Sequence, residues 1–506
     1  MQKQQFFYRL FEQNFSEYKR NRIAIYGMTE EAWFVLQNFP EYNFVAVLHK
    51  DNTGMFCELP IIQPTELVDM HVEIVIIVAR NHNIAIVAER IKDICSQNDI
   101  KVFSVAGLSM YDYGVRVQDD VNSDIYTGNA DWLRHSIYRG VLEQQLNEDD
   151  KLVLELFADK IRQLPMNEGK VIVDNLYDFS YVFLAPMITN FVFYIIKQLQ
   201  ESRFDKVLFA ARDGYLIHEL YKKAIKQLDL DNLPEDIYFL TSRMACITAG
   251  TTSGEDFFFL NTLPCAYDDK YMLEYRYNID ESLLSKCDRK IYPSTFEYMI
   301  GHKDSILEAG KRLRDNYNTY IKKAGIINGQ RCAFVDLVSS GTCQMMLSKF
   351  VDISLIGIYL GRYEVDGEIK RDLLPVKAMY EKRNLNEKDD WKGNYLFDHY
   401  WFMETVMTSF EPSLKRFDEC GNPVFANDVR TEKDIDAVKE MHRGIYDYFT
   451  NYMNQIGKRV PQCHSNISDI LYRYSGSEFT ENRVAYFQKQ TLFEDLGLGI
   501  LNAQEH

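Results

Sequence analysis

The sequence predicts an α/β protein: a Rossmann-like domain with a parallel sheet at the N-terminus, a larger second α/β domain, and a helical C-terminal region. Three observations support this. The 506 residues exceed what one hydrophobic core usually supports, so two or three domains are expected. Short apolar runs alternate with amphipathic segments, first near the N-terminus and again in the middle of the chain. Such alternation is typical of a parallel sheet covered by helices.

The first domain is predicted at residues 1–110. Its apolar runs are expected to be strands, at residues 22–27, 44–51, 72–80 and 101–105. The amphipathic segments between them are expected to be helices, at residues 29–39 and 83–97. Thr29 can cap the first of these helices. The order of these elements predicts a parallel sheet with helices on its faces.

The strand–glycine–helix opening of this domain is where a doubly wound fold places a nucleotide phosphate. The segment GMTEEA, however, has one glycine where the G-x-G-x-x-G pattern needs three. Glu30 and Glu31 in the first helical turn would also repel an anion. Nucleotide binding therefore stays open beside a docking or sensor role.

The rest of the chain divides into a helical linker at residues 111–170, the larger domain at residues 171–430, and helices at residues 431–506. The linker is expected to be helical at residues 131–163. The strands expected in the larger domain are residues 206–211, 237–243, 331–337 and 354–361. Its expected helices are residues 191–203, 215–228 and 344–350.

Bulk properties narrow the classes of function. The net charge of −17 argues against a nucleic-acid partner, because binding to the phosphate backbone needs an excess of Lys and Arg. A small anionic substrate stays possible, since a basic pocket can lie in an acidic protein. The nine cysteines are scattered and show no C-x-x-C pair, so reduced thiols in a cytosol are expected. The most apolar stretch, residues 183–196, is too short to span a bilayer, so a soluble, cytoplasmic protein is expected.

The strongest local signal is CAFVDLVSSGT, at residues 332–342. An apolar strand is expected to end at Asp336, and a loop of small residues then opens a helix. Backbone N–H groups and the positive end of a helix suit a phosphate, and Asp336 suits sugar hydroxyls or a divalent metal. The loop residues that would contribute are Ser339, Ser340, Gly341 and Thr342. A serine-rich helix cap with a solvated aspartate is the alternative.

Two further predicted strands also end in polar residues. Arg212 and Asp213 follow the strand in VLFAARDGYL, and Ser242 and Arg243 end the strand in YFLTSRMA. Parallel strands present ligands at the carboxyl edge of their sheet, and arginine can bind phosphate through two hydrogen bonds. We therefore expect these loops and the segment after Asp336 to converge on one pocket for a phosphate-rich substrate.

These motifs, in this order, resemble a known family. The segments that carry the resemblance are VFLAPMITNFVFYII, DKVLFAARDGYLIHELYKK, YFLTSRMA, FVDLVSSGTCQ, IGIYLG and FMETVMTSFEPSLKRFDECGNPVF, within about residues 175–430. They are similar to the C-terminal half of bacterial proteins from capsule and O-antigen gene clusters, often labelled as predicted haloacid-dehalogenase hydrolases. In the dual-domain ribofuranosyltransferases of that group, this half is a glycan phosphoribosyltransferase.

The resemblance implies transfer of 5-phosphoribose from phosphoribosyl diphosphate to a surface-polysaccharide acceptor. The acceptors in such pathways are often lipid-linked, which implies a cytoplasmic enzyme at the inner face of the inner membrane. Arg212 and Arg243, with Mg²⁺, would neutralise the departing diphosphate. Asp336 would bind ribose hydroxyls, and Asp213 would orient the acceptor hydroxyl or act as base. The substrate-binding residues would further include Ser242, Ser339, Ser340, Gly341 and Thr342.

The chain also departs from this family. The phosphatase half needs a strand ending in D-x-D, and neither VIVDNLYD nor LDLD has that context. The phosphatase is thus expected to be absent, and the front α/β domain to stand in its place. Where the family has a histidine, the segment at residues 409–413 reads SFEPS. A haloacid-dehalogenase-type phosphatase and a non-catalytic scaffold for polysaccharide assembly therefore remain as alternatives.

Overall fold

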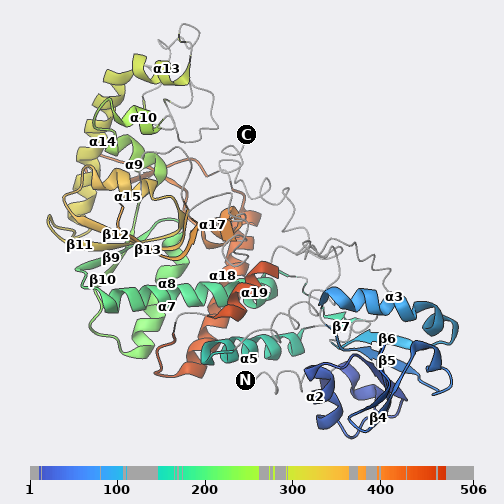
Figure 1. Ribbon diagram of the computed structural model, residues 1–506. Coiled ribbons are helices and arrows are strands. Elements are labelled where there is room, and N and C mark those ends of the chain that lie inside the picture. The colour runs from blue at the N-terminus through green and yellow to red at the C-terminus, as the bar shows by residue number, and fades with distance from the viewer. Residues whose placement is uncertain are drawn as a thin grey trace. The chain divides into compact units, whose positions relative to one another are not determined.

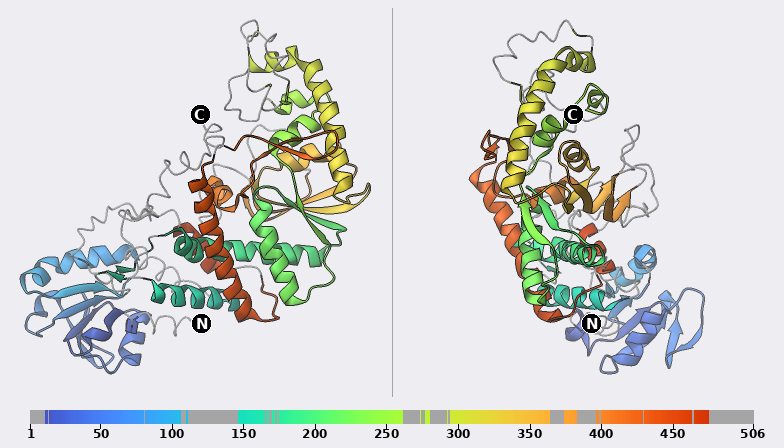
Figure 2. Two further views of the ribbon diagram at one scale, coloured as in Figure 1. Left: turned by 180° about the vertical axis from the view of Figure 1, so that it is seen from behind. Right: turned by 90° about the vertical axis from the view of Figure 1, so that its left-hand side faces the viewer.

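The computed structural model (Figures 1 and 2) gives the chain two compact units. Among the residues that the structure describes, one unit contains those before Asn175 together with Ser465–Tyr474, and the other contains those from Asn175 to Gln462. The structure describes residues 11–474 except 13, 80, 106–109, 111–145, 165, 168–169, 172, 174, 261–272, 274–276, 280–291, 293, 364–373, 383–395, 398–399, 429 and 463–464. Residues 131–145 of the predicted linker helix thus lie outside the described residues.

The first unit contains a six-stranded sheet in the order β3-β4-β2-β1-β5-β6. Its strands are β1 (Ile23–Tyr26), β2 (Phe44–Leu48), β3 (Gly54–Phe56), β4 (Leu59–Ile62), β5 (Ile74–Ile77) and β6 (Lys101–Ser104). Every pair is parallel except β3 with β4. The parallel strands, read across the sheet, have the order 3-2-1-4-5 typical of Rossmann folds. The predicted Rossmann-like domain is confirmed.

Two helices cover opposite faces of this sheet. On one face, α2 (Glu30–Asn38) packs through Ala32 and Val35, and the Thr29 side chain accepts a hydrogen bond from the Ala32 N–H as predicted. On the other face, α3 (Asn81–Gln97) packs through Ile91. The β3–β4 hairpin was not predicted, because its turn residues have positive φ yet are neither Gly nor Asn, the usual turn signal.

The first unit also contains α5 (Glu148–Gln163) and α19 (Asn466–Tyr474), which pack against each other. The Asp150 carboxylate is fully buried and accepts hydrogen bonds from the Ser465 hydroxyl at 2.8 Å and the Ile467 N–H at 3.2 Å. The predicted C-terminal helical region is therefore divided. Its helix α18 (Glu432–Ile456) belongs to the second unit, while α19 joins the first because it supplies the partners of Asp150.

The second unit is built on a five-stranded parallel sheet in the order β10-β9-β11-β12-β13. Its strands are β9 (Lys206–Ala210), β10 (Glu235–Phe239), β11 (Arg331–Ser339), β12 (Ser354–Tyr363) and β13 (Val376–Lys382). The chain moves outward from β9 to β10 and then returns to the other side of β9 to form β11. In such a 2-1-3-4-5 sheet, ligands bind outside the carboxyl ends of the two strands where the direction reverses. Here those strands are β9 and β11.

Helices cover both faces of the second sheet (Figure 1). One layer consists of α9 (Arg243–Gly250), α14 (Lys303–Lys323) and α15 (Thr342–Ser348), which share a core with the β9 side chains Leu208 and Ala210. The other layer contains α7 (Ala185–Glu201) and α8 (Gly214–Leu228). The remaining elements are α6 (Leu176–Phe179), η3 (Ser180–Leu184), α10 (Asp256–Leu260), α13 (Thr295–Gly301), α17 (Tyr400–Met407), β14 (Leu414–Phe417) and β15 (Pro423–Phe425). Together with the Rossmann-like unit, this confirms the predicted α/β fold class.

The apolar helix of this unit is longer than the sequence suggested. It runs without a break through α6, η3 and α7, from Leu176 to Glu201, and its 26 residues are long enough to cross a membrane. The estimate from residues 183–196 was wrong, because the flanking turns continue the same helix. Its most apolar window is 94% buried inside the protein, as in the core helix of a soluble protein. Much of this burial comes from α18, whose Gly444 approaches the Tyr177 backbone closely.

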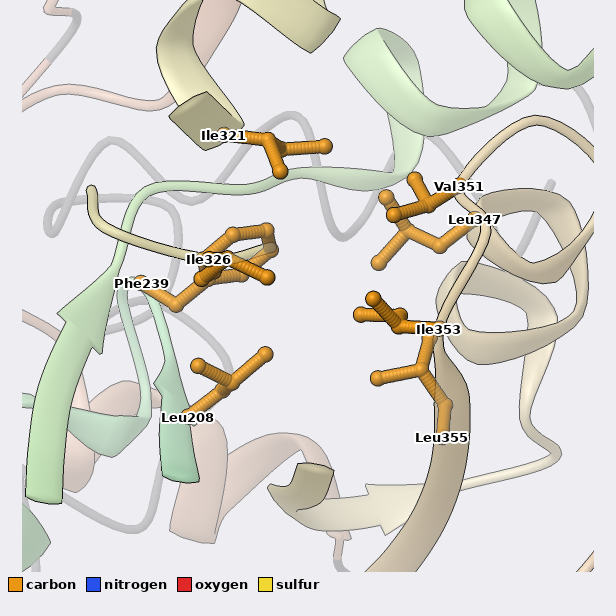
Figure 3. A pocket seen from close by; sticks show the side chains of 8 residues that line it. All are labelled: Leu208, Phe239, Ile321, Ile326, Leu347, Val351, Ile353 and Leu355. Carbon is orange, nitrogen blue, oxygen red and sulfur yellow. The ribbon is translucent and has the colours of Figure 1, made fainter. Parts of the chain in front are cut away.

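A small pocket in this unit has an entirely apolar lining (Figure 3). The side chains around it are Leu208, Phe239, Ile321, Ile326, Leu347, Val351, Ile353 and Leu355. A polar substrate would find no hydrogen-bond partner there. The pocket is therefore a gap in the packing and not the candidate site.

Candidate functional site

The loop between β9 and α8 carries two of the predicted catalytic residues. β9 ends at Ala210, and Arg212 and Asp213 follow at the carboxyl edge, where both side chains are half-buried. Gly214 then starts α8, and a Cβ atom there would lie 2.9 Å from the Phe209 carbonyl carbon. Only glycine allows this close return of the chain toward β9, which fixes the loop at the point where the sheet reverses direction.

Asp336 lies inside β11 and not at its tip as predicted. The strand continues to Ser339 because β12 pairs with it as far as the Ser339–Arg362 pair, whereas β9 pairs with it only as far as Val335. Asp336 is therefore level with the end of β9, beside the Arg212 loop. Its carboxylate accepts a hydrogen bond from the Leu337 N–H at 2.9 Å.

The loop after β11 is held by its own contacts. The Ser339 hydroxyl accepts a hydrogen bond from the Gly341 N–H at 3.0 Å and is also bonded to Asp336. Gly341 has a φ of 88°, which favours glycine, and it precedes α15. Ser340 is half-buried, while Thr342 is only 6% exposed. The loop does follow the strand as predicted, but the Ser339 hydroxyl already has partners within the protein.

Ser242 occupies a different position from the one predicted. β10 ends at Phe239 and not at Arg243, because Ser242 caps α9 by accepting a hydrogen bond from the Ala245 N–H at 3.0 Å. Its hydroxyl donates to the Leu414 carbonyl at 2.6 Å. Ser242 therefore positions the start of α9 and has no proton left for a substrate. Arg243, the first residue of α9, is exposed.

Glu404 is a residue of this site that the sequence reasoning missed. It lies in α17, which packs against α8, β11 and α18 at one end of the sheet (Figure 1). Its half-buried carboxyl group interacts electrostatically with Asp213, Arg243, Asp336 and Arg212. The apolar run WFMETVM could have revealed it, since a single charge in such a run usually has a specific partner or role.

The structure thus brings together charged groups from four elements. Asp213 interacts electrostatically with Arg212, Asp336 and Arg243, and Arg243 also acts on Asp336 and Glu404. Among the residues that the structure describes, no hydrogen bond or ion pair reaches the side chains of Arg212, Asp213 or Glu404. Partly buried charges are normally paired in a folded protein. Adjacent charges that have no partner are typical of a site that awaits a ligand.

The surroundings change the pKa values of these groups. Burial, together with Asp336, raises the pKa of Asp213 to about 7, against the opposing effect of the two arginines. Burial and the neighbouring Asp213 raise the pKa of Glu404 to about 8. Burial also raises the pKa of Asp336 and lowers the pKa of Arg212. Carboxyl groups with pKa values near neutrality are suited to proton transfer.

Arg430 holds the segment that follows α17. Its guanidinium donates to the carbonyls of Ser409 at 2.7 Å, Glu411 at 2.8 Å and Phe410 at 3.2 Å. It also donates to both carboxylate oxygens of Asp428, at 3.0 and 2.9 Å. Arg430 and Asp428 both interact electrostatically with Arg212, so the clamped segment lies beside the charged groups.

Aromatic rings pack together at the segment that Arg430 holds. The Tyr215 ring contacts Phe410 at 5.4 Å and Tyr238 at 5.8 Å, and all three residues are half-buried. An imidazole also lies here, since the His442 ring is 5.3 Å from Phe410. Burial lowers the pKa of His442 to about 4, and its Nε2 atom is bonded to the Val406 carbonyl. His442 is therefore neutral at pH 7 and serves packing.

The carboxylates do not form a metal cage. Within the described ranges, no group of three His, Cys, Asp or Glu side chains could hold a metal ion. A Mg²⁺ ion that arrives on a diphosphate needs only one or two protein carboxylates, because phosphate oxygens and water complete its shell. Asp336, with one oxygen bonded to Leu337, fits that lesser requirement.

No protein-family model matches this chain, and no curated protein matches it.

The structure brings together five charged residues: Arg212, Asp213, Arg243 and Asp336, which were predicted, and Glu404, which was not. Ser339, Ser340, Gly341 and Thr342 follow Asp336 after Leu337 and Val338, and Ser242 caps the helix that begins with Arg243.

Proposed function

We propose that the second unit is a glycosyltransferase that moves 5-phosphoribose from phosphoribosyl diphosphate to a hydroxyl group of a surface-polysaccharide precursor. One observation carries the proposal: the side chains of Arg212, Asp213 and Glu404, which have no hydrogen bond or ion pair within the described part of the chain, meet at the carboxyl edge where the sheet reverses direction. Cations for a diphosphate and carboxylates for sugar hydroxyls are then available at the same place. The motif resemblance names the sugar donor and the class of acceptor.

In this reaction the bond between the ribose anomeric carbon and the diphosphate weakens before the acceptor oxygen has fully attached. Positive charge builds on the sugar, and negative charge builds on the diphosphate. Arg212 and Arg243 stabilise the diphosphate, and Asp336 binds ribose hydroxyls. The Ser340–Thr342 turn would hold the 5-phosphate. Positioning and preorganised charge supply most of the rate in such a reaction. Mg²⁺ bound to the diphosphate would add further neutralising charge.

In this proposal the acceptor hydroxyl belongs to a lipid-linked precursor at the cytoplasmic face of the inner membrane. A peripheral enzyme agrees with the burial of the long apolar helix found within the described ranges. The 5-phosphate would be removed by a separate phosphatase.

The test is direct binding and turnover. Purified protein with Mg²⁺ and phosphoribosyl diphosphate is expected to show a higher melting temperature than protein alone, and to release diphosphate. Arg212→Ala is expected to abolish both effects, whereas Arg312→Ala, an exposed arginine on α14, retains them. A wild-type protein that neither binds nor consumes the donor contradicts the proposal. Hydrolysis of p-nitrophenyl phosphate would instead favour a phosphatase, and the absence of both activities a scaffold.

A further inference from the structure

We infer that Glu404 is the general base of the proposed transfer and takes the proton of the acceptor hydroxyl. The inference rests on the proposed function and adds to it a residue that no motif identified. It also differs from the expectation that Asp213 is the base.

Glu404 comes from a different element than the groups assigned to the donor. Arg212 and Asp213 share the β9–α8 loop, and Asp336 is in β11 at the same sheet edge. Glu404 lies in α17, which packs across both α8 and β11. In an in-line displacement the attacking oxygen approaches the anomeric carbon opposite the leaving diphosphate. The base therefore has to come from a side other than the one that holds the diphosphate.

The other two carboxyl groups are less suited to this role. Asp336 already accepts hydrogen bonds from the Leu337 N–H and the Ser339 hydroxyl, which hold it for binding. Asp213 is adjacent to Arg212, the cation proposed for the diphosphate, and interacts with that arginine more strongly than with any other charge. Among the residues described, Glu404 has no hydrogen bond or ion pair, so its lone pairs are free for a hydroxyl proton.

The segment that follows α17 offers a surface on which an acceptor sugar could bind. Arg430 fixes the carbonyls of residues 409–411, and the half-buried rings of Phe410, Tyr215 and Tyr238 lie together there. Aromatic rings are good surfaces for the C–H faces of sugars, since they combine apolar area with a polar edge. An acceptor sugar on these rings would lie beside the charged groups, between Phe410, which follows α17, and Tyr215 of α8.

The step balances without any further reactant. The acceptor oxygen forms a bond to the anomeric carbon, and the bond from that carbon to the diphosphate oxygen breaks. The electron pair of the broken bond leaves with the diphosphate, which the arginines stabilise. The hydroxyl proton moves to the Glu404 carboxylate and from there to water. Its pKa of about 8, raised by burial, makes the ionised carboxylate a stronger base than an ordinary glutamate. Because Glu404 is ionised only above that pH, the transfer is expected to speed up as pH rises through about 8, and rates are compared at about pH 9.

Azide tests the inference because it attacks without having a proton to lose. Wild type, Glu404→Gln, Asp213→Asn and, as matched control, Glu308→Gln on the exposed face of α14 are incubated with Mg²⁺ and phosphoribosyl diphosphate, with and without sodium azide. Diphosphate release and 5-phosphoribosyl azide are measured. General-base loss typically costs about 10²–10⁴-fold in rate. We expect Glu404→Gln to lose at least about 10²-fold with water as acceptor, and azide to restore most of that loss.

Each other result has a definite meaning. If Glu404→Gln keeps the wild-type rate with water, or if azide does not restore its activity although the donor still binds, Glu404 is not the base. If azide restores Asp213→Asn and not Glu404→Gln, Asp213 is the base and the inference is wrong. If wild type consumes no donor with either water or azide, the proposed function itself fails, which is distinguishable from the first two results.

Discussion

Replacing Arg430 with alanine is expected to destabilise the second unit more than any ordinary surface substitution. The guanidinium is almost fully buried, and it donates to the carbonyls of Ser409, Phe410 and Glu411 as well as to Asp428. Truncation leaves these carbonyls without their donor. It also leaves Asp428 without its cation, although Asp428 is exposed enough for water to solvate it.

The expected loss follows from the contacts. A buried acceptor that loses its partner costs about 1–3 kcal/mol. Ser409 is only 1% exposed, so its carbonyl bears most of this cost, and the more exposed Glu411 carbonyl can turn to water. We therefore expect Arg430→Ala to lower the free energy of unfolding by about 3 kcal/mol. Arg430→Lys keeps the charge but has one donor centre, and it is expected to lose about half as much.

Urea unfolding followed by circular dichroism measures this difference. At a slope of about 2–3 kcal/mol per molar urea, the midpoint of the second-unit transition should fall by about 1 M. The control is Arg312→Ala, which removes an exposed arginine and is expected to stay within about 0.5 kcal/mol of wild type. If Arg430→Ala and Arg312→Ala unfold at the same urea concentration, the clamp does not stabilise the segment and the argument from burial is wrong.

Three other substitutions test the structure. Because the pKa of Glu404 is raised to about 8, the folded protein holds a proton that the unfolded chain releases above about pH 4.3, so its stability falls as pH rises from about 5 to 8. Glu404→Gln should therefore be more stable than wild type at pH 8 and equal to it near pH 5. If urea unfolding gives the same difference in stability between variant and wild type at both pH values, this expectation is wrong. Gly214→Ala should lower stability by about 1–3 kcal/mol and weaken donor protection in thermal melts, because its Cβ would meet the Phe209 backbone; unchanged melts would show that the loop can shift. Val351→Ile should raise stability by up to about 0.8 kcal/mol by filling the apolar pocket, and a lower melting temperature would mean that the gap is too small.

Much of the fold could be predicted because both sheets are buried and parallel, apart from the β3–β4 pair. Their strands are continuous apolar runs such as KVLFA in β9 and IVII in β5, which contrast clearly with the amphipathic helices between them. The ends of the strands were less predictable. β10 ends early because Ser242 caps a helix, and β11 ends late because β12 continues to pair with it. Both limits depend on neighbours that are distant in sequence.

The candidate site was predictable only where its residues follow a strand. Arg212 and Asp213 come directly after β9, so the carboxyl-edge rule located them. Glu404 lies in α17, far from β9 in the sequence. Only the packing of α17 against α8 and β11 brings it to the carboxyl edge of the sheet. Arg430 was missed for the same reason, since its partners are backbone carbonyls that no motif marks.

Helices α5 and α19 belong to the same unit although they are far apart in the sequence, and this affects folding during synthesis. Asp150 and its partner Ser465 are 315 residues apart, and the described part of the second unit is synthesised between them. At about 5–20 residues per second, a ribosome needs roughly 15–60 s to cover that interval. During that time the buried Asp150 carboxylate keeps its hydrogen bond from the neighbouring Asn147 N–H but lacks the Ser465 and Ile467 donors to its other oxygen. A fragment ending at residue 174 would stay in this incomplete state, so dissecting the protein at that point should yield an aggregation-prone product unless a peptide containing residues 465–474 is added.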